Sequence, residues 1–207
     1  MGDVEDRILA GAVEAASVHG IGRMSVGDVA KRAGLSRATV YKHFGSKDEL
    51  VAAAVRREAT ALIDVVVADV AHVADLRDAM TRAVLVTLQL ARAHPLLDRV
   101  VRTEPERLVP LLTTDDALVL PVLRGPVEAV VGGRLPALDA VAVRRVADVF
   151  LRLLVSYALS APDDPPEVVA AVVGTLLIDG AAAVTAVGGA LGGGTGRHGH
   201  HVPGEAS

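Results

Sequence analysis

Apolar residues recur about every four positions through most of this 207-residue chain, and this spacing most constrains its fold. Side chains four apart share one face of an α-helix, whereas a half-buried β-strand needs strict alternation of apolar and polar residues. No sustained alternation occurs, and glycines and prolines separate the periodic stretches. The sequence therefore predicts an all-α protein. The expected helices are 4–19, 26–33, 37–44, 47–70, 76–94, 141–160 and 167–187, with an interrupted helix within 115–135.

Hydroxyl residues mark the starts of several of these helices. Three pairs have the spacing of a capping box: Ser25 with Asp28, Ser46 with Glu49, and Thr103 with Glu106. Ser36 is placed to cap helix 37–44. Gly27 is unusual inside helix 26–33, because glycine lowers helix stability by about 1 kcal/mol relative to alanine. Three short helices and one long helix thus fit into the first 70 residues.

The last two expected helices are more apolar than one buried face requires. In helix 141–160 the charged residues Arg144, Asp148 and Arg152 share one face, and most other positions are apolar. Helix 167–187 is apolar almost all round. A soluble monomer does not expose so much apolar surface. We therefore expect a homodimer that forms through about residues 141–187.

Composition excludes several classes of protein. Hydrophobic residues make up 51% of the chain, which is too many for a wholly disordered protein. Because cysteine is absent, the chain has no disulfide, no thiol nucleophile and no cysteine-type zinc site. The longest strongly apolar run, 168–178, is shorter than the roughly 20 residues that span a bilayer. With an N-terminus unlike a signal peptide, this predicts a cytoplasmic protein without a membrane partner.

The charged residues are unevenly distributed. The formal net charge is −4, yet the window Arg23 to Lys47 holds six cations, including all three lysines, against the single anion Asp28. A compact basic patch on an acidic protein indicates a local site for a polyanion. On charge alone, a solvated charged face is an equal alternative.

The segment 26–44 has the form of a helix-turn-helix, in which a tight turn joins two short helices. In DNA-binding proteins the second helix of this unit lies in the major groove. Val40 and Phe44 are expected on its inner face. The outer face then carries Arg37, Ala38, Thr39, Tyr41, Lys42 and His43. Such side chains suit base edges and phosphates, so DNA is favoured over the alternative, an ordinary helical hairpin.

These residues resemble the DNA-binding domain of TetR-family transcriptional regulators. The resemblance spans Arg7 to Glu58 and is carried by Ile8-Leu9-Ala10, His19-Gly20 and the continuous stretch 24–50. It implies that Tyr41 and Lys47 contact DNA phosphates, with Thr39 and His43 nearby. The residues that it implies to face the bases are Arg37, Ala38 and Lys42.

The same resemblance implies an organisation and a mechanism. Members of the family are usually homodimers that bind inverted repeats in double-stranded DNA, mostly as repressors. A small molecule enters the C-terminal domain and changes the separation of the two recognition helices. We therefore expect a helix-turn-helix DNA-binding domain over 1–47, a helical ligand-binding and dimerisation domain over 48–187, and a flexible Gly/His-rich tail over 188–207.

An effector pocket is expected between helices 47–70, 76–94 and 141–160 and the interrupted helix. The candidate lining residues are Leu88, Gln89, Arg92, Phe150, Leu154 and Tyr157, with Leu85, Leu112 and Leu123 as further apolar groups. The scarcity of aromatic residues favours a small aliphatic or acyl-like effector. The alternative is a C-terminal domain that only dimerises or binds another protein. A cavity that solvent can reach would favour an effector, and a filled core would favour the alternative.

Neither catalysis nor a bound cofactor or metal is expected. The chain lacks a cysteine nucleophile, a G-x-S-x-G motif, a P-loop and the Glu-x-x-His pairs of a di-iron bundle. Residues 194–199 match G-x-G-x-x-G, but no expected strand precedes them and no expected helix follows. His198, His200 and His201 are interpreted as part of the flexible tail rather than as metal ligands. The sequence thus predicts a regulator and not an enzyme.

Overall fold

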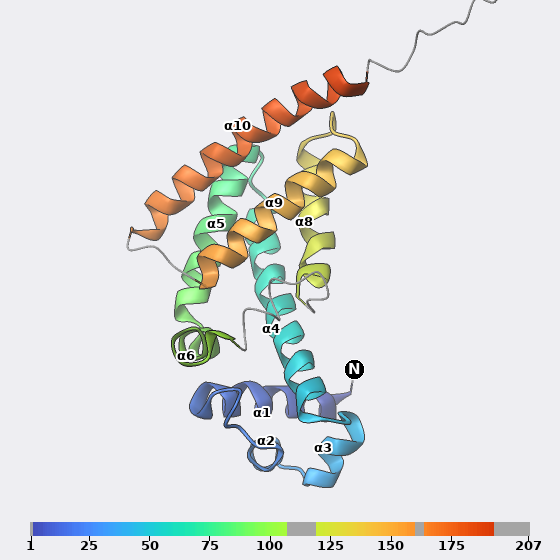
Figure 1. The fold of residues 1–207 in the computed structure, drawn as a ribbon, viewed down its shortest axis with the longest axis vertical. Coiled ribbons are helices and arrows are strands. Elements are labelled where there is room, and N and C mark those ends of the chain that lie inside the picture. Colours follow the sequence, from blue (N-terminus) through green and yellow to red (C-terminus); the bar gives the residue numbers. More distant parts are fainter. Residues whose placement is uncertain (1, 107–118, 160–163, 193–207) are drawn as a thin grey trace, which may run out of the picture.

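The computed structural model describes residues 2–106, 119–159 and 164–192. Within these ranges every regular element is an α-helix (Figure 1), so the predicted all-α class is confirmed. The helices in chain order are α1 (Asp3–His19), α2 (Val26–Ala33), α3 (Arg37–His43), α4 (Lys47–Val70), α5 (Leu76–Ala93), α6 (Pro95–Thr103), α8 (Leu120–Arg134), α9 (Ala140–Leu159) and α10 (Pro166–Gly192).

The first three helices form a compact unit at one end of the molecule (Figure 1). α2 begins with the predicted capping box: the Ser25 hydroxyl accepts from the Asp28 N–H at 3.2 Å, and the Asp28 carboxylate accepts from the Ser25 N–H at 2.9 Å. Gly34 ends α2 in the left-handed conformation, with φ +67°, which favours glycine. The Arg7 guanidinium donates to the Ala33 carbonyl at 2.7 Å and so ties α1 to this turn.

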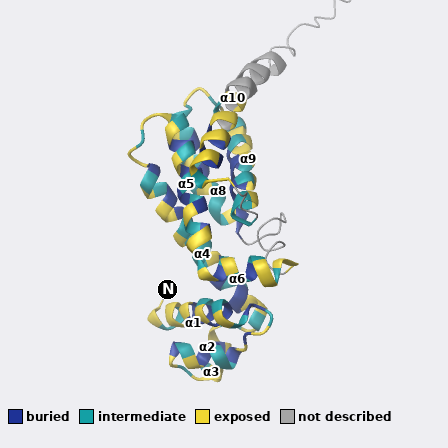
Figure 2. Ribbon diagram, turned by 90° about the vertical axis from the view of Figure 1, so that its left-hand side faces the viewer, coloured by how far each residue is buried: buried dark blue, intermediate teal, exposed yellow. Residues whose placement is uncertain are grey.

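α4 connects this unit to the C-terminal helices and belongs to two separate clusters of buried side chains. Its first turns, including Leu50 and Val55, pack with α1, α2 and α6. Its later turns, including Ile63 and Val70, pack with α5, α8, α9 and α10. In Figure 2 buried residues occur in both parts of the molecule, along α1 and along the C-terminal helices. α4 is therefore the long element that the two cores share.

The chain remains helical after Pro95, where the sequence predicted a stop. α5 ends at Ala93, and α6 begins at Pro95. A proline suits the first position of a helix because the N–H that it lacks has no partner there. His94 caps the new helix: its Nδ1 accepts from the Leu97 N–H at 3.4 Å. Thr103 is the last residue of α6 and donates to the Arg99 carbonyl at 2.8 Å. Residues 105–106 are helical again, at the place where a further helix was predicted to begin.

Two later helices also differ from the prediction. α8 starts at Leu120 and continues through Pro126, although an interruption was expected. A proline removes one backbone hydrogen bond, and here the helix is retained with Val127 and Val131 buried in the C-terminal core. α10 extends to Gly192, five residues beyond its expected end. Residues 107–118 and the tail after 192 lie outside the described residues.

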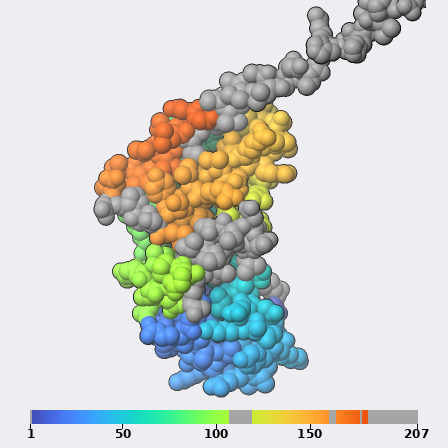
Figure 3. All heavy atoms as spheres, viewed as in Figure 1, coloured from blue at the N-terminus to red at the C-terminus, as the bar shows by residue number. Residues whose placement is uncertain are grey.

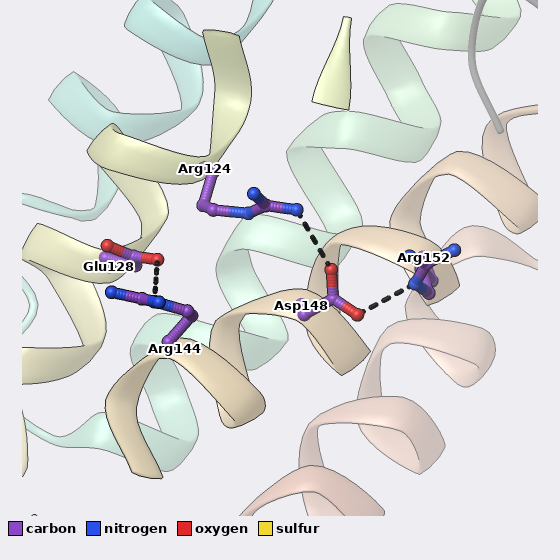
Figure 4. Close-up of polar contacts among 5 residues, drawn as sticks. All are labelled: Arg124, Glu128, Arg144, Asp148 and Arg152. Carbon is purple, nitrogen blue, oxygen red and sulfur yellow. Dashed lines mark hydrogen bonds and ion pairs between the residues drawn. The ribbon is translucent and has the colours of Figure 1, made fainter. Parts of the chain in front are cut away.

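The charged face of α9 packs against α8 (Figure 4). Asp148 accepts from Arg152 at 2.8 Å and from Arg124 of α8 at 3.4 Å. Arg144 lies 3.9 Å from Glu128, also on α8. The hydrogen bond from Arg152, assisted by Arg124, holds the pKa of Asp148 below its usual value. The residues predicted to share one face thus join two neighbouring helices.

α10 lies across α5 (Figure 1), where a glycine allows a close approach. A Cβ atom at Gly174 would lie 2.1 Å from the hydroxyl oxygen of Thr81 and 3.1 Å from its Cα. Arg77 of α5 and Asp179 of α10 form an ion pair of 2.8 Å near this contact. In the described part of the chain, no helix is long and apolar enough to cross a membrane.

Candidate functional site

The outer face of α3 forms an exposed polar surface at the end of the molecule (Figure 2). Val40 is fully buried and Phe44 is half-buried, so this side of the helix faces the core. The remaining predicted contact residues point away from it: Arg37, Ala38, Tyr41, Lys42 and His43 are exposed, and Thr39 is half-buried. Tyr41 has 51% of its surface accessible, unusually much for a large ring. The structure thus brings these six residues together on one short helix.

The side chain of Arg37 occupies the space above Gly27. A Cβ atom at Gly27 would lie 2.5 Å from one terminal nitrogen of Arg37 and 2.7 Å from its Nε. The guanidinium therefore lies across α2 where a side chain is missing. This close approach accounts for a glycine inside a helix, which helix propensity alone disfavours.

Lys47 has a structural contact besides its predicted role. Its ammonium nitrogen donates to the Gly22 carbonyl at 2.8 Å and so ties the start of α4 to the loop between α1 and α2. The Gly22 N–H donates to the carboxylate of Glu104, just after α6, at 2.7 Å. Gly22 is therefore held from two sides. His43, also a predicted DNA contact, lies 3.5 Å from the Glu5 carboxylate.

A cavity of about 120 Å³ lies between α4, α5, α6, α8 and α9. It sits where the two buried clusters meet: Val55 and Val100 belong to the first cluster, and Ile63 and Leu154 to the second. Its described lining residues are Val55, Glu58, Ala59, Leu62, Ile63, Val66, Thr87, Leu90, Ala91, His94, Leu96, Leu97, Val100, Val119, Leu123, Leu151, Leu154, Val155, Ala158 and Leu159. The wall is therefore mainly aliphatic.

Among the six residues predicted to line an effector pocket, Leu154 lines this cavity. Leu88 and Phe150 are buried in the adjoining core, Tyr157 is half-buried, and Gln89 and Arg92 are exposed. Among the further apolar candidates Leu123 lines the cavity, Leu85 does not, and Leu112 lies outside the described residues.

On α5, the predicted and the observed wall residues lie on different sides of the helix. The α5 residues predicted to line a pocket were Leu85, Leu88, Gln89 and Arg92, whereas the structure places Thr87, Leu90, Ala91 and the following His94 in the wall. Each lies two positions further on, which is about 200° around a helix. α5 packs on α4 and α9 and also on α10, so apolar spacing alone does not tell which buried side carries the cavity.

Sequence reasoning missed a polar pair in the cavity wall. The Glu58 carboxylate lies 3.1 Å from Nε2 of His94, and both residues line the cavity. The hydrogen bond from His94 holds the pKa of Glu58 below its usual value, although burial acts in the opposite direction. The signal available in the sequence was His94 immediately before Pro95, the position of a cap for a second helix.

Comparison with known families agrees with this arrangement. A family model described as bacterial regulatory proteins of the tetR family matches residues 8–54. A second model, described as the C-terminal domain of the bacterial tetracyclin repressor, matches residues 75–178, half of the chain. The chain belongs to the TetR family. The resemblance on which the sequence prediction depended is thereby confirmed.

Individual TetR-family relatives and similar folds extend the comparison. An uncharacterised HTH-type transcriptional regulator from Mycobacterium tuberculosis is 32% identical over 92 residues, which are 44% of this chain and 46% of the relative. The chain thus spans about half the length of the curated relatives that it matches. The repressor AlkX from Dietzia has a similar fold, with a TM-score of 0.72 and 19% identity over 87% of this chain and 96% of AlkX. FadR from Bacillus subtilis, solved with stearoyl-CoA, has a TM-score of 0.59 and 17% identity over 84% and 98%.

Proposed function

We propose that this TetR-family protein is a transcriptional regulator that binds an inverted-repeat operator as a homodimer and is released by a small-molecule effector. The observation that carries the proposal is the exposed outer face of α3, which presents basic, hydroxyl and aromatic side chains beyond a helix-turn-helix core. Release by an effector makes repression the natural mode of action, and the protein acts in the cytoplasm. No catalytic role is part of the proposal.

The residues of α3 divide into two roles in this proposal. Arg37, Ala38 and Lys42 face the base edges, where arginine and lysine donate to guanine. Tyr41, with Thr39 and His43 nearby, contacts phosphates. Lys47 joins the phosphate contacts without leaving Gly22, because an ammonium group has three donors and the Gly22 carbonyl uses one of them.

The proposed dimer forms through α9 and α10. Both helices lie on the face of the molecule drawn in Figure 3, coloured orange. Five large apolar side chains on them are about half exposed or more: Val141, Val149, Val168, Val172 and Leu176. Those of α10 recur every four residues and so follow one side of the helix. An exposed apolar face of this kind supports contact with a second copy of the chain.

The cavity supports an effector over the alternative of a purely dimerising or protein-binding domain, which would have a filled core. Its aliphatic wall suits a hydrocarbon chain better than a flat ring system. Two proteins of similar fold also support an effector with a hydrocarbon chain. AlkX is implicated in the biodegradation of n-alkanes, and FadR was solved with stearoyl-CoA. We therefore propose an effector with an aliphatic part.

The first test is fluorescence anisotropy with DNA from upstream of the protein's own gene, titrated at several salt concentrations. Selective binding over a scrambled duplex is expected, with an affinity that falls as salt rises. The double variant Tyr41→Ala/Lys47→Ala should bind at least about tenfold more weakly. Its salt slope should be smaller by about one for each phosphate that the variant no longer neutralises.

The matched control is Arg56→Ala, which removes an exposed cation of α4 outside the proposed surface. It should bind DNA like the wild type, and circular dichroism should show that the double variant is folded. If the upstream DNA shows no selectivity, selection from genomic fragments follows. A folded protein that binds no DNA in either experiment would contradict the proposal.

A further inference from the structure

The described residues of the cavity wall include an acidic side chain but no lysine or arginine. Three of its residues have polar side chains, Glu58, Thr87 and His94, and none of its described residues is lysine or arginine. Glu58 and His94 are largely buried, with 26% and 16% of their side-chain surfaces accessible. The charge of this pair therefore determines which polar group a bound molecule can bring into the cavity.

The hydrogen bonds of His94 fix where its proton lies. Nδ1 accepts from the Leu97 N–H at 3.4 Å, so this nitrogen presents its lone pair to the start of α6. A neutral imidazole then carries its proton on Nε2, which lies 3.1 Å from the Glu58 carboxylate and donates to it.

Glu58 carries the negative charge of the pair. The hydrogen bond from His94 lowers the pKa of Glu58, so the carboxylate is ionised at neutral pH. His94 satisfies one carboxylate oxygen, Oε2. An ionised carboxylate has two oxygens and about four lone-pair sites, so Glu58 retains capacity to accept from a bound molecule.

Building on the effector-controlled function proposed above, we infer that the effector is an aliphatic molecule whose polar end donates a hydrogen bond to Glu58. Alcohols and primary amines have this chemistry, and carboxylates do not. A carboxylate in the cavity would face Glu58, and no described residue of the wall is a lysine or an arginine. Burying an unpaired charge beside a like charge is strongly unfavourable. The inference therefore separates this site from one built for a free fatty acid.

The size and shape of the cavity determine which compounds are suitable for testing this inference. The α4 residues in the wall run from Val55 to Val66, about 16 Å along the helix axis, so the lining is elongated. An apolar cavity of about 150 Å³ holds benzene, so the present cavity of about 120 Å³ limits the probe to a short chain, and six carbons fit within the length of the lining. Hexylamine, 1-hexanol and hexanoate share one chain and differ at the polar end.

The experiment is isothermal titration calorimetry of the full-length protein with these three compounds at pH 7.5, without DNA. We expect hexylamine and 1-hexanol to bind about 10-fold to 100-fold more tightly than hexanoate, the range for a hydrogen bond to a charged group. Glu58→Gln should reduce this preference by about tenfold. Asp64→Asn, an exposed acid on the same helix and outside the cavity wall, should leave it unchanged.

Two results would overturn the inference: hexanoate binding as tightly as hexylamine, or no binding by any of the three compounds. The comparison among the compounds uses the wild-type protein and so does not depend on the folding of Glu58→Gln. Failure of the proposed function gives a different result. Hexylamine would then bind in calorimetry while operator DNA, followed by anisotropy, stays bound.

Discussion

Gly27 has no side chain, and this leaves the space that the side chain of Arg37 occupies. Replacing Gly27 by alanine puts a methyl group where the Arg37 guanidinium lies, 2.5 Å from its nitrogen. A guanidinium is the end of a flexible side chain, so the arginine moves and the fold remains. We expect Gly27→Ala to stabilise α2 by up to about 1 kcal/mol and to weaken specific DNA binding by about tenfold, through the displaced base contact.

Thermal unfolding and anisotropy on one preparation test the two effects together. Gly45→Ala provides a comparison, since a Cβ atom there would meet Glu49 and not a residue of the outer face of α3. If Gly27→Ala binds specific DNA as well as the wild type, the position of Arg37 over α2 does not matter for recognition.

Glu58 should make a measurable contribution to the pH dependence of stability. Its pKa is lower in the folded protein than its usual value of 4.5, chiefly because His94 donates to it. A lowered folded pKa stabilises the fold at pH values above the unfolded pKa, and this contribution is lost as the pH falls through the folded pKa. The free energy of unfolding of wild type minus that of Glu58→Gln should therefore decrease below about pH 4.5. A difference that stays constant from neutral to acid pH would contradict this.

At the scale of helices, local signals predicted beginnings better than ends. Ser25, Ser36 and Ser46 each start a helix as expected, because a capping side chain acts on N–H groups two or three residues away. The sequence predicts that Pro95 stops a helix and that Pro126 interrupts one. The first instead opens α6, and the second lies within α8. Whether a proline ends a helix depends on packing with other helices, which the local sequence does not contain.

The same distinction applies to the two parts of the site. The outer face of α3 follows from a single helix, since Val40 and Phe44 define its inner side, and its residues were placed from the sequence. The cavity wall requires the relative rotation of several helices. On α5, buried on more than one side, that rotation is not encoded in apolar spacing. The pair Glu58 and His94 also joins a residue of α4 to the residue between α5 and α6.

The contact between α5 and α10 is tight enough to test by adding one methyl group. In Gly174→Ala the new Cβ would lie 3.1 Å from Cα and Cβ of Thr81 and closer to its hydroxyl. Rotation moves the hydroxyl but not the backbone, so the helices must separate. Overpacking costs about 1–3 kcal/mol, and removing a helical glycine returns about 1 kcal/mol. We expect a net loss of up to about 2 kcal/mol in urea unfolding followed by circular dichroism.

Gly133→Ala is the control, on α8 and outside the exposed apolar stripe of α10. A Cβ atom there would meet nothing within 4 Å, so alanine should stabilise the protein by up to about 1 kcal/mol. Both variants must be compared at one protein concentration, because dimer formation affects apparent stability. Equal shifts for Gly174→Ala and Gly133→Ala would show that the close approach has no energetic effect.

At the scale of the whole molecule, the exposed apolar face of α9 and α10 predicts the oligomeric state. Val172 and Leu176 are 53% and 67% exposed. The double variant Val172→Glu/Leu176→Glu should therefore leave the monomer folded. In a dimer the same carboxylates would be buried without partners, which raises the dimer dissociation constant by about 100-fold or more. Sedimentation velocity measures this. Val65→Glu alters another half-exposed valine, on α4, and should leave the dimer intact.

The position of the cavity between two cores suggests a route by which the proposed effector would influence the DNA-binding helices. α6 contributes Leu96, Leu97 and Val100 to the wall. Immediately after α6, Glu104 accepts from the Gly22 N–H at 2.7 Å, and its carboxylate occupies space that a Cβ at Gly20 would need. A displacement of α6 by a bound molecule would therefore reach the loop between α1 and α2 through Glu104, in addition to the direct packing of α6 on α1.

Glu104→Ala should thus weaken the coupling between the cavity and the DNA-binding surface more than it weakens the binding of hexylamine or of DNA alone. Coupling is the factor by which hexylamine raises the dissociation constant of the complex with operator DNA. Operator DNA must raise the dissociation constant of hexylamine by the same factor. We expect the factor to fall by about fivefold or more in Glu104→Ala, measured in both directions by anisotropy and calorimetry. Glu106→Ala removes a nearby exposed acid and should keep the wild-type factor. Unchanged coupling in Glu104→Ala would mean that the signal does not pass through Glu104, and that it travels along α4, which both cores share, or through the packing of α6 on α1.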